Sequence, residues 1–212
     1  MTLSGAGRNA LRASAILLAF AAIGTAMLAY THDHTEPVIE KSRQAERLTL
    51  INQVLPAGRY DNDLLASEQT LPADPLLGTR KPSAAWIARR GNALAGVVLE
   101  AVAPDGYAGE IALLIGVAAD GTVTGVRVTA HRETPGLGDY IEHAKSSWAD
   151  QFAGKSLTAP DTKRWAVRKD GGAFDARAGA TITPRAVVKA VKNALAYYER
   201  HRAAWAAGEK QP

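Results

Sequence analysis

The sequence contains no cysteine among its 212 residues. Disulfides, cysteine-held iron–sulfur clusters, thiolate zinc sites and cysteine nucleophiles are therefore excluded. The absence suits an oxidising compartment, but many cytosolic proteins also lack cysteine, so it says little about location by itself.

Other common signatures are missing too. The sequence has no serine-centred nucleophile elbow, no HExxH run and no GxGxxG between a strand and a helix, so hydrolase and dinucleotide-binding functions lack their usual support. The formal net charge is +4. Arg8 and Arg12 precede every acidic residue, and the small remaining excess is dispersed, which argues against nucleic-acid binding.

One long uncharged segment is present, residues 13–30, and it also lacks proline. As a helix it would span about 27 Å, close to the hydrocarbon thickness of a bilayer. A cleaved signal peptide has a shorter apolar core followed by a small-x-small site. Here Ala19 and Ala21 lie in the middle of the run, so a retained single-pass anchor is favoured over a cleaved signal.

The flanking charges predict the orientation of this anchor. Arg8 and Arg12 lie on its N-terminal side, whereas the other side has no lysine or arginine until Lys41. The positive-inside rule then places the N-terminus in the cytoplasm and the following domain outside, although counting as far as Arg47 weakens the asymmetry. His32 and His34 form an H-x-H pair without a recognisable third ligand, so we predict a polar linker and no metal site.

Beyond the anchor, the pattern predicts an α+β domain with helices on one face of a small antiparallel sheet. Residues 38–55 read as an amphipathic helix ended by Pro56 and Gly58, and residues 56–83 as a loop-rich connection with a short strand. Three valine- and isoleucine-rich segments predict strands, at 95–103, 109–120 and 121–130. Asp120-Gly121 predicts a mirror-image hairpin turn with positive φ at both positions.

The C-terminal part alternates short elements with one long helix. We predict one or two short helices over 139–153, and a strand at Trp165 and Val167 followed by a turn at Asp170-Gly171-Gly172. Apolar side chains recur with helical spacing over 184–205, which predicts the last helix. They are Val187, Val188, Val191, Leu195 and Tyr198.

The segment 175–185, directly before that helix, has the features of an anion site. Gly179 permits a tight turn, and Thr183 followed by Pro184 is a favourable helix start. Free N–H groups and the helix dipole would then accommodate a phosphate beside the Thr181 hydroxyl, bound or covalently attached. Asp175 is a candidate carboxylate for a metal–phosphate assembly during attachment. The alternative is an ordinary capped helix after a glycine turn.

The second candidate segment, 131–138, follows the third predicted strand. Two glycines around Leu137, after a proline, end the strand and let a flat ring approach the main chain. His131 and Glu133 are a candidate acid–base pair. The alternative is a sharp loop with an incidental histidine.

These segments carry a family resemblance. The run Asp175-x-x-Ala178-Gly179-Ala180-Thr181 resembles the flavin-attachment motif D-x-x-(S/T)-G-A-T of FMN-binding domains. Residues 133–138, E-T-P-G-L-G, and residues 106–109, G-Y-A-G, look like further segments of that family. With Leu55-Pro56 and residues 60–63, the chain is similar to the G subunit of the Rnf (Rsx) electron-transport complex from about residue 10 to residue 205.

The resemblance implies that FMN is esterified through its phosphate to Thr181, with Asp175, Gly179 and Ala180 in the attachment signature. It implies that five residues line the isoalloxazine ring: Glu133, Thr134, Gly136, Leu137 and Gly138. No catalytic residue is implied. The family usually has serine or threonine where this chain has Ala178, which puts recognition by the attaching enzyme in question but leaves the acceptor hydroxyl in place.

The implied function is an electron carrier in an ion-translocating ferredoxin:NAD-type oxidoreductase of the bacterial inner membrane, with its C-terminal domain in the periplasm. Its implied partners are the other membrane and iron–sulfur subunits of the Rnf/Rsx complex and a flavin transferase. The alternatives are the C subunit of a sodium-translocating NADH:quinone oxidoreductase, a stand-alone flavin reductase and a non-redox interaction module. The expected divisions are a cytoplasmic N-terminus (1–12), a transmembrane helix (13–30), a membrane-proximal region (31–85), an FMN-binding domain (86–205) and a tail (206–212).

Overall fold

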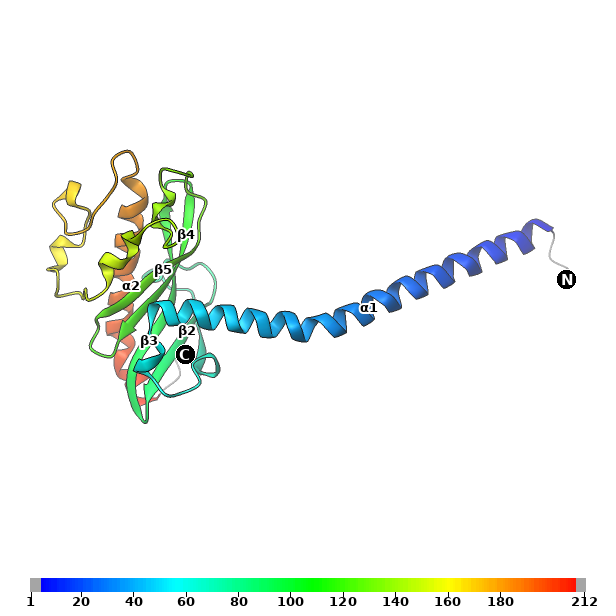
Figure 1. Ribbon diagram of the computed structural model, residues 1–212, viewed down its shortest axis with the longest axis horizontal. Coiled ribbons are helices and arrows are strands. Elements are labelled where there is room, and N and C mark those ends of the chain that lie inside the picture. Colours follow the sequence, from blue (N-terminus) through cyan, green and yellow to red (C-terminus); the bar gives the residue numbers. More distant parts are fainter. Residues whose placement is uncertain (1–4, 209–212) are drawn as a thin grey trace. The chain divides into compact units, whose positions relative to one another are not determined.

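The computed structural model describes residues 5–208 (Figure 1). The chain divides into two compact units, the first ending at Glu46 and the second beginning at Arg47. Residues 1–4 of the expected cytoplasmic segment and 209–212 of the expected tail lie outside the described residues. The rest of the expected tail belongs to the last helix and its cap.

The first helix, α1 (Gly5–Val54), is longer than expected. The sequence predicted a transmembrane helix, a linker and a second helix, but the helix continues through the linker and through Pro37. The linker contains no glycine, and the fixed φ of proline is helical, so Pro37 costs a backbone hydrogen bond without forcing an end. By length and composition α1 is the one candidate membrane span of the described residues, and its apolar window is unburied.

The second unit is built on a five-stranded antiparallel sheet with strands in sequence order. The strands are β1 (Glu68–Leu71), β2 (Ser83–Arg90), β3 (Ala93–Gly106), β4 (Gly109–Ala118) and β5 (Val123–Ala130). The α+β class and the three predicted strands are thereby confirmed, as is the short strand predicted within 56–83. β2 was missed, and the paired β1 and β2 place the expected boundary at 85/86 inside the sheet.

The sheet separates two apolar layers, because successive side chains of a strand point to opposite faces. Figure 1 shows α2 (Ile182–Ala207) lying along one face. Leu99 of β3 and Ile115 of β4 pack there against α2. On the other face Val98 and Trp86 pack with Ile51 and Val54, at the end of α1.

The turn between β4 and β5 differs from the predicted one. Gly121 has φ +85°, but no residue other than glycine in the described chain has positive φ, so Asp120 does not. The Gly121 N–H donates to the Ala118 carbonyl, and the Asp120 carboxylate accepts from the Thr122 N–H. This is a type I turn followed by a left-handed glycine, which tolerates Asp120 where the mirror-image turn would strain it.

The remaining helices are short 3-10 turns. They are η1 (Ala57–Arg59), η2 (Leu65–Ser67), η3 (Asp139–Ile141), η4 (Ser147–Phe152), η5 (Thr162–Arg164) and η6 (Arg168–Asp170). Short helices within 139–153 are therefore confirmed.

The predicted strand at Trp165 and Val167 is wrong, since Val167 forms only an isolated bridge with Phe174. Trp165 instead packs against Phe174, with ring centroids 4.8 Å apart. This aromatic contact anchors the segment without a ladder of backbone hydrogen bonds. The predicted turn at Asp170–Gly172 is confirmed, with Gly171 in the left-handed region.

The backbone at the end of α1 lies very close to the backbone of β5, and this contact gives the first prediction. A Cβ on Gly125 of β5 would lie 2.9 Å from the Val54 Cα and 3.1 Å from the Gln53 carbonyl oxygen. Both neighbours are main-chain atoms and cannot rotate away. We expect Gly125→Ala to lower the free energy of unfolding by about 1–3 kcal/mol.

The check is urea denaturation of the detergent-solubilised chain, followed by the fluorescence of its tryptophans, all of which lie beyond residue 85. Gly58→Ala is the matched control, because a Cβ there meets nothing within 4 Å. Equal midpoints for the two variants would show that this approach imposes no constraint.

Candidate functional site

The two segments singled out in the sequence meet at one small cleft of about 120 Å³. Its walls come from three places: the β3–β4 hairpin tip, the loop after β5 and the start of α2. The lining residues are Tyr107, Glu133, Thr134, Leu137, Gly138, Gly179, Ala180, Thr181, Ile182 and Thr183. Most of the predicted site residues are therefore brought together; Gly136 and Asp175 are not among the lining residues.

The loop after β5 is shaped by its glycine. The N–H groups of Leu137 and Gly138 both donate to the Thr134 carbonyl, at 3.1 and 3.0 Å. Gly136 has φ +76°, a backbone conformation that side chains disfavour. The role of Gly136 is thus to close the loop, and the closed loop presents Leu137, which is 44% exposed, at the cleft.

Glu133 ties the three walls together. Its side chain is buried, with 4% of its surface exposed. One carboxylate oxygen accepts from the Ala108 N–H at 3.0 Å, in the hairpin tip, and the other accepts from the Thr183 hydroxyl in α2. A Cβ on Gly106 or Gly138 would lie 2.9 Å from this carboxylate, so both glycines leave room for it.

Thr181 lies at the N-terminal end of α2. Helix α2 begins at Ile182 with Thr181 as its N-cap, and the Thr181 side chain makes no capping hydrogen bond. The predicted cap at Thr183 is wrong, because that hydroxyl is buried and donates to Glu133 instead. Gly179, with φ +85°, turns the chain into the helix as predicted. The half-buried Thr181 hydroxyl thus stands at the cleft beside the positive end of a helix.

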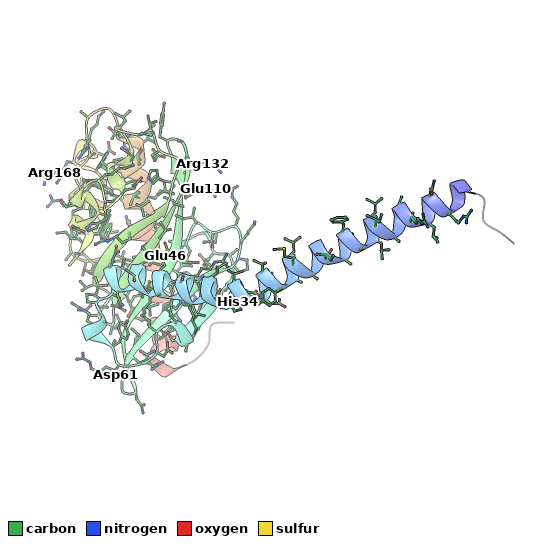
Figure 2. All side chains as sticks on the ribbon, turned by 45° about the vertical axis from the view of Figure 1, so that its right-hand side comes forward. His34, Glu46, Asp61, Glu110, Arg132 and Arg168 are labelled. Carbon is green, nitrogen blue, oxygen red and sulfur yellow. The ribbon has the colours of Figure 1, made fainter. Side chains whose placement is uncertain are left out.

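The Asp175 carboxylate is exposed and forms an ion pair with Arg168, with 2.7 Å between Oδ1 and Nε. Figure 2 shows Arg168 at the outer edge of this unit. The Asp175 backbone is held by Gln151, which accepts its N–H, and by Trp148, which donates to its carbonyl. Asp175 is therefore fixed in place but directs its charge outward, where another protein can reach it.

The side chains of the candidate acid–base pair, His131 and Glu133, bind different partners. His131 Nδ1 accepts from the backbone N–H of Glu133, and His131 Nε2 lies 2.6 Å from the Glu142 carboxylate. Glu142 and the buried Asp139 both bind the Lys145 ammonium, at 2.9 Å each. The hydrogen bond from Lys145 is the main reason why the pKa of Asp139 and the pKa of Glu142 are below their usual values.

Comparison with known proteins bears on what this cleft holds. A family model described as FMN-binding domain matches residues 106–196, and one described as RnfG N-terminal region matches residues 1–54. Relatives named as the G subunit of an ion-translocating oxidoreductase complex occur in Pseudomonas aeruginosa PAO1 and in Vibrio cholerae El Tor N16961. They are 48% and 47% identical, over 92% of this chain and 91% and 93% of theirs.

The chain belongs to the G-subunit family of ion-translocating oxidoreductase complexes. This confirms the resemblance read from the sequence. It makes the chain part of an oxidoreductase, with an FMN-binding domain, consistent with a flavoprotein electron carrier that has other subunits as partners.

The cleft of this G-subunit family member suits a flavin in its chemistry, but it is too small to enclose the ring. Within the described part of the second unit, the exposed large apolar side chains are Tyr107, Leu137 and Ile182, at 66, 44 and 47%, and all three line the cleft. Pockets that enclose a drug-sized ligand hold about 300–1,000 Å³, so this cleft suits a ring that rests largely on the surface.

Sequence reasoning missed three lining residues, although the signals were present. Tyr107 stood in the G-Y-A-G turn, and Ile182 is an apolar residue between two threonines at a helix start. Thr183 was assigned to the wrong partner, because a threonine before a proline fits a cap equally well.

The buried hydrogen bond between Thr183 and Glu133 gives the second prediction. Thr183→Val keeps the shape but leaves the buried carboxylate without this donor, and we expect a loss of about 1.5–3 kcal/mol in the free energy of unfolding. Thr183→Ser retains the hydroxyl and should lose no more than about 1 kcal/mol, for one methyl group. Thermal and urea denaturation measure both, and equal losses in the two variants would contradict the assigned bond.

The Lys145 network gives a prediction on pH. Because the pKa values of Asp139 and Glu142 are lowered in the folded state, the network stabilises the fold above their unfolded values. That contribution to stability is lost as the pH falls from about 4 through the lowered pKa values of the two carboxyl groups in the folded state. Wild type should therefore exceed Lys145→Met in urea midpoint near neutral pH, with the gap closing in acid.

Lys189→Met is the control for this measurement, since Lys189 forms an ion pair with Asp105 in which both side chains are exposed. Such pairs contribute little, so its midpoint should follow wild type at each pH. A gap for Lys145→Met that stays constant across the acid range would refute the assignment.

Proposed function

We propose that this chain is a membrane-anchored subunit that carries FMN covalently, through its phosphate, on Thr181, and relays electrons within a ferredoxin:NAD-type complex. The observation that carries the proposal is the convergence of the 133–138 loop and the Gly179–Thr181 turn on one cleft, with the Thr181 hydroxyl at its edge. A phosphate at that point lies beside the first N–H groups of α2, which favour an anion.

Attachment requires the Thr181 Oγ to form a bond to the flavin phosphorus while another bond to that phosphorus breaks. A flavin transferase would supply a donor with a phosphoanhydride bond, such as a flavin dinucleotide; that bond breaks, and the nucleoside monophosphate leaves together with the hydroxyl proton. The Thr181 hydroxyl makes no capping bond that would have to be broken first. Asp175 and its exposed carboxylate suit contact with such an enzyme rather than with the ring.

FMN supplies electron transfer when bound, and the chain supplies its position. Tyr107, Leu137 and Ile182 offer apolar contact to a flat ring, while the covalent link prevents loss of the cofactor. The shallow cleft would leave part of the ring open to a redox partner. Glu133, Thr134 and Gly138 form the rest of the loop-side wall.

The membrane anchor is the second part of the proposal. We propose that residues 13–30 are retained in the bacterial inner membrane, with the second unit in the periplasm. The positive charges of Arg8 and Arg12 on the N-terminal side of this segment support that orientation. A covalent link has an advantage there, because FMN is made in the cytoplasm and a lost cofactor is not easily replaced. The proposed partners are the membrane and iron–sulfur subunits of the complex.

A stand-alone flavin reductase is less well supported. It would need a substrate pocket with an acid or base beside the flavin. His131 and Glu133 suggested one, but His131 is paired with Glu142 and the Glu133 carboxylate is occupied by donors from Ala108 and Thr183.

The test is flavin attachment in Thr181→Ala and Thr181→Ser, made together with a flavin transferase. Wild type should gain the mass of one FMN minus water and fluoresce in a denaturing gel, and Thr181→Ala should lose both signals completely. Thr181→Ser keeps an acceptor hydroxyl and should retain measurable attachment. An unmodified wild type, with the transferase active on a control substrate, would contradict the proposal.

A further inference from the structure

Glu133 is a buried carboxylate without a cationic partner. Its two oxygens accept from the Ala108 N–H and the Thr183 hydroxyl, both neutral donors. None of the ion pairs formed by the described residues includes it. The Ala108 N–H can only donate, so one oxygen of the carboxylate accepts from the main chain. The structure thus holds a carboxylate by neutral donors, with no cation against it, in the wall of the cleft.

This charge is alone in the cleft. Of the ten lining residues, the other nine are two glycines, an alanine, a leucine, an isoleucine, three threonines and a tyrosine. The charged residues closest to Glu133 in the sequence do not line the cleft: Arg132 is exposed outside it, and His131 binds Glu142. A flavin beside Thr181 therefore has Glu133 as the only charged group in the wall against it.

A fixed negative charge opposes the addition of an electron to a neighbouring group. The interaction is strong where water is excluded, because the effective dielectric constant near a buried charge is far below that of water. Its sign does not depend on how the ring is turned, since any added negative charge near the carboxylate is disfavoured.

We propose that Glu133 holds the reduction potential of the flavin low, so that the reduced protein is a stronger electron donor. The inference rests on the proposed function, namely FMN on Thr181. Glu133 is a tuning residue that acts through its charge. Glu133 also holds the hairpin tip, the loop and α2 together by hydrogen bonds, and that structural role is distinct from the effect of its charge. Loss of these hydrogen bonds alone would change the stability of the protein but would not shift the flavin potential in a defined direction.

The experiment is a redox titration of the FMN-loaded full-length chain in detergent, with dithionite and mediators, followed by flavin absorbance. Glu133→Gln removes the charge and keeps the shape. Glu199→Gln is the matched control: Glu199 lies on α2, seventeen residues after Ile182, and pairs with Arg202. At 1.5 Å per residue that is about 26 Å away, beyond the screening length of about 8–10 Å.

We expect Glu133→Gln to raise the ratio of reduced to oxidised flavin at a given potential at least about tenfold relative to wild type. For a one-electron step this is a positive shift of about 59 mV. Glu199→Gln should stay within about twofold of wild type. The double variant Glu133→Met/Thr183→Val removes the charge together with its buried donor, and should shift in the same direction if Glu133→Gln alone does not fold.

Intact mass is measured first, because it shows whether the chain carries FMN before any potentials are compared. Wild type without the FMN adduct overturns the proposed function and this inference with it. If wild type carries the adduct but the charge-removing variants have the same flavin potential as Glu199→Gln, only the inference about Glu133 is overturned. A negative shift on loss of the charge overturns it as well.

Discussion

The candidate site depends on one buried side chain, Glu133. Its carboxylate accepts from the hairpin tip through Ala108 and from α2 through Thr183, while its own backbone N–H donates to His131. The room it occupies is left by Gly106 and Gly138, whose missing Cβ atoms would meet it. The two segments that the sequence singled out are therefore joined by one acidic side chain of the first, which accepts from Thr183 of the second.

Local patterns predicted the elements well where side-chain periodicity is strong. Val187, Val191 and Leu195 marked the buried face of α2, and they are buried in the structure. β2 was missed because its sequence, SAAWIARR, is rich in alanine and ends in two charges, so neither alternation nor a valine-rich run reveals it. The linker before Pro37 read as a break because its residues are polar, yet none of them prevents a helix.

In the candidate site too, the sequence predicted local features but not the partners of single side chains. The glycine at 179 and the helical spacing after it predicted the turn and the last helix, because each depends on its immediate neighbours, but the helix starts at Ile182 and not at Pro184. The partners of Thr183, His131 and Asp175 could not be predicted this way. Each bond joins residues far apart in the sequence or competes with an equally good local one: Thr183 lies fifty residues from Glu133. Tertiary packing decides which of these partners each side chain binds.

The central claim is that FMN is joined to Thr181 and to no other hydroxyl. The most direct measurement is fragmentation mass spectrometry of the tryptic peptide 178–185, from chain isolated from its native host. This peptide carries two threonines, Thr181 and Thr183, and only the first is free of the Glu133 carboxylate. The account predicts that the added mass lies entirely on Thr181. An unmodified peptide, or the mass on Thr183, would contradict it.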